Sequence, residues 1–226
     1  MNNTLSTTFK YFFILFSLLG VTNSMAQDIF FSEYVEGSGN NKCLELFNPT
    51  NARINLAPYT IQIFTNGSSS PVGVPWNLSG RSIGSLSTLV LCSGLADAPL
   101  QATEDGHFGF GSFNGDDAIV LYKNGRKIDI IGVIGCDPGE AWTSGNLSTK
   151  DATLIRTSCV AKGSTNTSGC SFRGLRSEWI ALPKDNYSNL GKHNFGLVPI
   201  EIIGNSALCN NPSVTLTVTP EGLGSY

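Results

Sequence analysis

The chain has 226 residues, with 14 lysines and arginines against 17 aspartates and glutamates, so its formal net charge at pH 7 is −3. The basic residues are not clustered, which argues against a protein that grips nucleic acid along a basic stripe. Few residues are charged, whereas glycine, serine, threonine and asparagine are common, and this composition is typical of an exported β-protein with many turns.

The first 26 residues have the three-part pattern of a secretion signal. Lys10 precedes an apolar stretch over residues 11–21 that is too short to span a bilayer, and Ser24-Met25-Ala26 is a small-x-small cleavage site. We therefore predict a cleaved signal peptide over residues 1–26 and a mature chain that begins at Gln27. The mature protein is then secreted, extracellular or held at the cell surface, and no later segment is apolar and long enough to cross a membrane.

Short apolar segments separated by turn residues recur along the rest of the chain. A strand is predicted at each of residues 31–35, 43–47, 59–64, 88–92, 118–122 and 127–134. Simple alternation in the first strand would place Phe31, Glu33 and Val35 on one face. Asn124-Gly125 joins two strong strands and predicts a hairpin. No segment has a sustained helical period, so we predict an all-β, immunoglobulin-like antiparallel sandwich.

The composition of the chain changes near residue 196. We assign residues 27–196 to one β-sandwich and residues 197–226 to a linker and the truncated start of a second immunoglobulin-like domain. Residues 213–220 alternate β-branched and polar side chains, as in a strand, and Cys209 precedes them. Because so few residues of that domain are present, we predict that the sequence is part of a longer exported protein.

Six cysteines in an exported chain favour disulfides over a metal site, and no Cys-x-x-Cys spacing occurs. Cys159 and Cys170 bracket a polar loop and are predicted to pair. Two of Cys43, Cys92 and Cys136 can also pair, but the sequence does not say which two. Cys209 stands apart, with a partner expected beyond residue 226.

Three carboxylates, Glu33, Glu36 and Glu45, flank the polar turn at residues 37–41. Together with Asp116 and Asp117 they would supply oxygen ligands for calcium if their loops converge. The simpler interpretation is that they order turns by accepting backbone hydrogen bonds, since the EF-hand pattern is missing. We therefore expect no cofactor and keep calcium as the lesser hypothesis.

No catalytic residue is predicted. His107 and His193 are the two histidines, and neither has a nucleophile or an orienting acid nearby in the sequence. Asp116 and Asp117 are adjacent, so on a strand they would face opposite ways and could not act together on a glycoside. We expect this chain not to be an enzyme.

Aromatic side chains are the better indication of binding. Trp76 and Trp142 are candidates for stacking against sugar rings or bases, and Trp76 is the one expected to be exposed. Trp179 and Tyr59 are assigned to the core because their neighbours are apolar. Arg173 and Arg176 lie close together in the sequence and would suit a phosphate or a carboxylate, although a solvated rim is the simpler interpretation.

Several stretches together resemble the bacterial lamin-tail domain. The opening, residues 32–42 (SEYVEGSGNNK) and 44–48 (LELFN), is the most characteristic. Later stretches follow in the expected order across residues 28–195. They are residues 113–118 (FNGDDA), 128–132 (IDIIG), 137–142 (DPGEAW), 153–156 (TLIR), Trp179 and 189–191 (NLG).

The resemblance implies an immunoglobulin-like sandwich with no catalytic centre of its own. Domains of this kind in bacteria accompany exported nucleases, phosphatases and adhesins, and the form of residues 33–41 is similar to the start of extracellular deoxyribonucleases. The leading hypothesis is a non-catalytic binding or spacer module at the N-terminus of a larger exported protein. Its partner would be a polysaccharide, extracellular DNA or another surface protein. The alternative is an accessory domain of a secreted metal-dependent nuclease or phosphatase whose catalytic domain is absent here.

Overall fold

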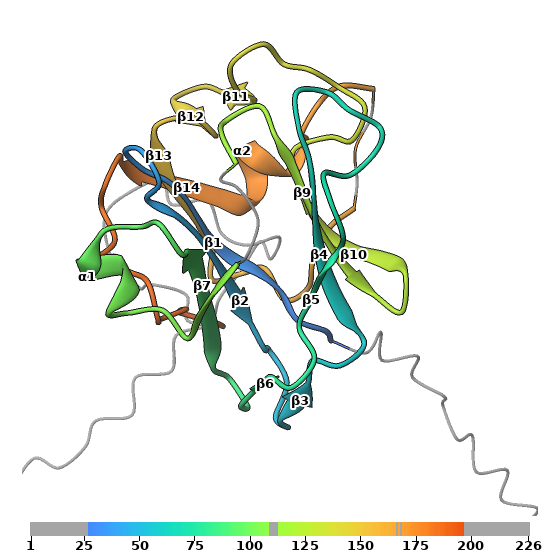
Figure 1. The fold of residues 1–226 in the computed structure, drawn as a ribbon, viewed down its shortest axis with the longest axis vertical. Coiled ribbons are helices and arrows are strands. Elements are labelled where there is room, and N and C mark those ends of the chain that lie inside the picture. Colours follow the sequence, from blue (N-terminus) through green and yellow to red (C-terminus); the bar gives the residue numbers. More distant parts are fainter. Residues whose placement is uncertain (1–26, 109–112, 166, 168, 197–226) are drawn as a thin grey trace, which may run out of the picture.

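The computed structural model describes residues 27–108, 113–165, 167 and 169–196 (Figure 1). The predicted signal peptide and the predicted second β domain, with Cys209, lie outside these residues. None of the helices in the described part of the chain has the length and apolar character needed to cross a bilayer.

Two sheets form the body of the molecule. The larger has six strands in the order β14-β13-β1-β2-β7-β8. Its strands are β1 (Phe30–Glu36), β2 (Lys42–Phe47), β7 (Thr88–Ser93), β8 (Gly106–Phe108), β13 (Ala152–Arg156) and β14 (Trp179–Pro183). The smaller sheet has the order β10-β9-β4-β5. Its strands are β4 (Tyr59–Phe64), β5 (Trp76–Asn77), β9 (Ala118–Lys123) and β10 (Arg126–Ile131).

Short elements complete the fold. Two small ribbons pair β3 (Ile54–Asn55) with β6 (Ser82–Ile83) and β11 (Thr143–Ser144) with β12 (Leu147–Ser148). In the described part of the chain the two helices are α1 (Ala98–Gln101) and α2 (Gly174–Glu178), which are too short to leave a helical period in the sequence. All strand pairs are antiparallel except β7 with β8, which is parallel. The predicted all-β sandwich is thus confirmed.

The predicted hairpin is also confirmed, since β9 and β10 pair around a two-residue turn. Asn124 and Gly125 have φ angles of 49° and 73°, the left-handed region that this kind of tight turn requires. The second strand ends at Ile131, three residues earlier than the alternation predicted. Gly132 follows with a φ of 81°, and the ring of Trp142 packs where a side chain on Gly132 would lie.

The simple alternation predicted for the first strand is wrong. The register of β1 with β2 shifts between Phe31 and Glu33, so Ser32 is the extra residue of a β-bulge. As a result Phe31 and Tyr34 both face the other sheet, whereas Glu33 and Val35 face the opposite way. The bulge therefore moves Glu33 from the face of Phe31 to the outer face of the large sheet.

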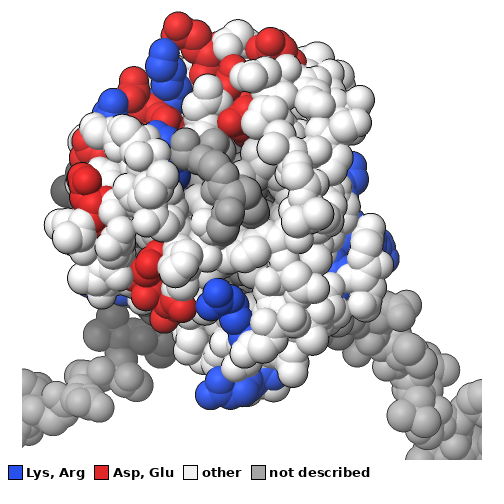
Figure 2. Space-filling view, viewed as in Figure 1, with Lys and Arg blue, Asp and Glu red and all other residues white. Residues whose placement is uncertain are grey.

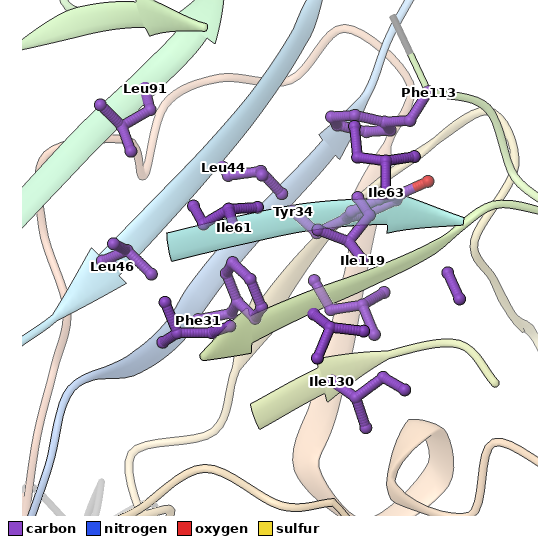
Figure 3. Packing of buried hydrophobic residues seen from close by; sticks show 14 of the residues in the cluster. Phe31, Tyr34, Leu44, Leu46, Ile61, Ile63, Leu91, Phe113, Ile119 and Ile130 are labelled. Atoms are coloured by element: carbon purple, nitrogen blue, oxygen red, sulfur yellow. The ribbon is translucent and has the colours of Figure 1, made fainter. Parts of the chain in front are cut away.

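The main core lies between the two sheets (Figure 3). Phe31, Tyr34, Leu44, Leu46 and Leu91 project from the large sheet toward side chains of the smaller one, namely Ile61, Ile63, Ile119 and Ile130. All of these side chains are buried. Because both sheets contribute apolar residues to a single layer, burial of this layer is the main source of stability.

The outer face of the large sheet is also buried. Residues 184–196, here called the covering segment, cross it after β14 together with α1. Leu190 of this segment and Leu100 of α1 belong to one buried apolar cluster with Val35 of β1. His193 and Phe195 both contact the ring of Phe47. The large sheet is therefore packed on two sides, which explains why all seven residues of β1 are buried.

Disulfides join Cys43 to Cys92 and Cys136 to Cys170. The first links facing positions of β2 and β7. The predicted pairing of Cys159 with Cys170 is wrong, although Cys159 is also disulfide-bonded. The intervening loop does not close on itself but lies along the edge of β10, where Ser164 N–H donates to the carboxylate of Asp129 and Ser164 C=O accepts from Ile130 N–H.

We expect peptide mapping under non-reducing conditions to recover Cys43 joined to Cys92 and Cys136 joined to Cys170. Because the two bonds close loops of 49 and 34 residues, removing either pair with alanines should cost about 2–4 kcal/mol of unfolding free energy. Chemical denaturation of each double variant measures that cost. Recovery of a Cys159–Cys170 peptide from folded protein would contradict the connectivity.

Candidate functional site

Two of the five candidate metal-binding carboxylates meet on the outer face of the large sheet. Glu33 and Glu45 face each other across β1 and β2, and both side chains are fully buried beneath the covering segment. Glu45 accepts a hydrogen bond from Ser32 Oγ at 2.5 Å and one from Gly191 N–H at 2.7 Å. Glu33 accepts from Asn189 Nδ2 at 2.8 Å through one oxygen, whereas its Oε1 has no partner.

Burial changes the ionisation of this pair. Loss of solvent raises the pKa of Glu33 to about 7 and that of Glu45 to about 8, and the neighbouring Glu33 charge adds to the rise at Glu45. The hydrogen bonds from Ser32 and Gly191 lower the pKa of Glu45, but by less than burial raises it. These carboxyls therefore hold protons near neutral pH, which is the opposite of what a cation ligand needs.

The other three carboxylates lie elsewhere. Glu36 pairs with Lys42 Nζ at 2.6 Å and accepts from Asp151 N–H. Asp117 accepts from Asn66 N–H at 3.1 Å and from Asn114 N–H at 2.9 Å, and so holds two loops together. Asp116 is buried with Oδ1 unpartnered, and it lines a small cavity of about 260 Å³ together with Glu36.

The structure thus separates the five carboxylates into three groups. These are the buried pair Glu33 and Glu45, the pair Glu36 and Asp116 at one cavity, and Asp117, which holds two loops together. Among the described residues no three histidine, cysteine, aspartate or glutamate side chains are grouped so as to hold a metal ion. Four of the five carboxylates accept hydrogen bonds from the protein, and three of them, Glu36, Glu45 and Asp117, accept from backbone N–H groups. Calcium binding stays a prediction.

The two histidines lie in different surroundings. His107 is exposed, with Nδ1 3.6 Å from the carboxylate of Glu104. His193 belongs to the covering segment and packs its ring against Phe30 and Phe47 of the large sheet. Burial, with a smaller contribution from the Arg156 charge, lowers the pKa of His193 to about 4, so it is neutral at physiological pH.

A buried ion pair connects the two sheets. Arg156 of β13 is 2% exposed, and its guanidinium donates to both oxygens of Asp129 of β10. The guanidinium also pairs with Glu178 at 2.5 Å and lies against the rings of Phe30 and Trp179. Asp129 is fully buried and also accepts from backbone N–H groups of the large sheet, of β10 and of the loop beside it, at Phe31, Ile130 and Ser164.

The sequence analysis did not single out this ion pair. The sequence feature that could have indicated the ion pair is a single charged residue in each of two apolar strands. Asp129 lies within Ile128–Ile131, and Arg156 follows Ile155. A charge at such a position is rarely buried without a partner. The identity of the partner depends on the packing of β13 against β10, which sequence spacing does not reveal.

The aromatic candidates divide as follows. Trp179 and Tyr59 are buried, as predicted. Trp76 is partly buried rather than exposed, since its ring packs edge-on against Phe108 in the main core. Trp142 is 5% exposed, so it offers no open stacking face.

Trp142 nevertheless lines a cavity of about 540 Å³ together with Arg173 and Arg176. The sequence analysis considered the two arginines together and Trp142 apart from them, and the fold brings all three to one place between the β11–β12 ribbon and α2. This cavity has polar chemistry suited to binding, because the two arginines bring two cations to one hollow of the surface.

Comparison with known proteins gives one match. The sequence profile of the Lamin Tail Domain family matches residues 22–135, just over half of the chain. No curated protein and no solved structure matches it. The matched range contains every strand from β1 to β10.

Proposed function

The chain belongs to the lamin-tail domain family, and from this premise we propose that it is a non-catalytic binding or spacer module of an exported protein. The family is immunoglobulin-like and has no catalytic centre of its own. The observation that carries the proposal is the use of the candidate carboxylates. Glu36, Glu45 and Asp117 each hold together separate segments of the chain.

Export is supported by the disulfides. Cys43–Cys92 and Cys136–Cys170 are two cross-links in one sandwich, and such bonds persist in oxidising compartments outside the cytosol. The signal-like segment at residues 1–26 gives the same indication from the sequence. A domain cross-linked by two disulfides is suited to an oxidising extracellular environment.

The test uses the full chain expressed with its own N-terminus in a secreting host. We expect the secreted protein to begin at Gln27 and to leave DNA and phosphate esters intact in the presence of calcium, magnesium or a chelator. Turnover that requires metal and is lost on Glu33→Ala or Asp116→Ala would contradict this proposal. It would equally contradict the alternative, an accessory domain of a secreted metal-dependent nuclease or phosphatase whose catalytic domain is absent here. Retention of residues 1–26 inside the cell would contradict export.

A further inference from the structure

The cavity beside α2 has a donor-rich lining. Its polar side chains are the guanidinium groups of Arg173 and Arg176 and the hydroxyls of Thr143, Ser144 and Ser171, and no carboxylate lines it. Both arginines are exposed, and neither forms an ion pair with any carboxylate in the described part of the chain. Two uncompensated guanidiniums at one cavity favour a ligand that carries negative charge.

Trp142 also lines the cavity, and its indole carries a further N–H group. A Cβ placed on Gly132 would meet Cζ3, Cη2 and Cε3 of Trp142 at 2.6–3.1 Å, so the six-membered ring rests on Gly132. The pyrrole edge, with Nε1, is therefore on the side of the indole away from Gly132. Only 5% of Trp142 is exposed, and its Nε1 has no acceptor among the described atoms. A buried N–H without an acceptor is costly, so an anionic oxygen that reached this edge of the indole would satisfy it.

The walls of the cavity are held in place by the fold. Trp142 N–H donates to Thr149 Oγ1 at 3.0 Å, Thr149 N–H donates back to Trp142 C=O at 3.1 Å, and the Thr149 hydroxyl donates to Gly115 C=O at 2.5 Å. On the other side, the Cys136–Cys170 disulfide ties the cavity wall to the chain after β10. A site whose walls are already ordered loses little entropy when a ligand binds.

We propose that this cavity binds an acidic saccharide, with a carboxylate of a hexuronic acid between Arg173 and Arg176 and the sugar ring against Pro138, which is partly exposed. A volume of about 540 Å³ lies in the range of pockets for small ligands and would hold one or two sugar rings. This inference rests on the proposed function, for which it supplies a ligand class.

A nucleic acid fits the charge distribution less well. Affinity for DNA comes from many phosphate contacts along a basic surface, whereas the whole chain has a net charge of −3. On the face drawn in Figure 2, acidic side chains lie over the top and the left, with basic ones among them, and further basic side chains lie at the right and the bottom, without a continuous positive band. A ligand with one or two charges on an otherwise neutral body matches two arginines better than a polyanion does.

The experiment is calorimetric titration of the secreted full chain with a trimer of galacturonic acid. A neutral galactose trimer, inorganic phosphate and a short DNA duplex are titrated in parallel. We expect saturable binding of the acidic trimer and at least roughly tenfold weaker binding of the neutral trimer and of phosphate. R173Q/R176Q should weaken binding of the acidic trimer by roughly tenfold or more, because both charge-assisted contacts are lost.

Two further variants control for charge and for the indole. R126Q/K127Q removes the same number of charges from exposed positions on the β9–β10 hairpin and should leave affinity unchanged. Trp142→Phe keeps an aromatic ring but removes the N–H and should weaken binding several-fold, with a thermal melt confirming that the variant is folded.

The inference is overturned if the two trimers bind alike, if R173Q/R176Q binds as the parent chain does, or if DNA or phosphate binds while the acidic trimer does not. None of these results would alter the tests of export and hydrolysis, which do not involve this cavity. Failure here is therefore distinguishable from failure of the proposed function.

Discussion

Replacing Asp129 by asparagine is expected to lower the unfolding free energy by about 3–5 kcal/mol, the typical cost of breaking a buried ion pair. The substitution leaves the buried guanidinium of Arg156 with Glu178 alone and turns an amide toward groups that donate to the carboxylate, including Phe31 N–H. For a domain of this size the melting temperature should fall by roughly 10 °C. Urea denaturation and thermal unfolding measure the two quantities.

The matched control is Asp151→Asn. Asp151 pairs with Lys184 at the surface, both side chains being well exposed, and an exposed pair contributes about 0–1 kcal/mol. A second check is the double variant D129N/R156M, which should cost less than the two single variants combined because it leaves no unpaired buried charge. A loss below about 1 kcal/mol for Asp129→Asn would show that the ion pair does not hold the sheets together.

Glu45→Gln is expected to remove much of the pH dependence of stability. Glu45 ionises near its ordinary pKa of 4.5 in the unfolded chain, whereas burial raises its pKa to about 8 in the folded protein. Between these values the folded protein holds a proton that the unfolded chain has lost. The contribution of Glu45 to stability is therefore fully present below pH 4.5 and falls as the pH rises through the interval. From pH 5 to pH 8 this one group should account for roughly 3–4 kcal/mol.

Glutamine suits this position because its oxygen can accept from Gly191 N–H while its amide donates to Ser32 Oγ. Denaturation curves at several pH values should therefore show the variant increasingly more stable than the parent chain above pH 6. Glu140→Gln, at an exposed position, is the control and should keep the parent pH profile. Parallel profiles for the parent and Glu45→Gln would mean that Glu45 titrates normally and that the covering segment does not bury it.

The sandwich, its main strands and the β9–β10 hairpin could be predicted from the sequence, because alternation and turn chemistry are local properties of the chain. Residues 59–64 and the Asn124-Gly125 turn carry their structure in their own side chains. The motifs of the opening strands indicated the family by the same local logic.

Features that depend on contacts between distant segments could not be predicted and became visible in the fold. The bulge at Ser32 turned Glu33 outward, and the covering segment, more than 150 residues later, then buried it beside Glu45. The same holds for the partner of Cys170 and for the meeting of Trp142 with two arginines. Which side chain faces which neighbour is set by register and by layer packing, and neither is encoded in the spacing of residues along one strand.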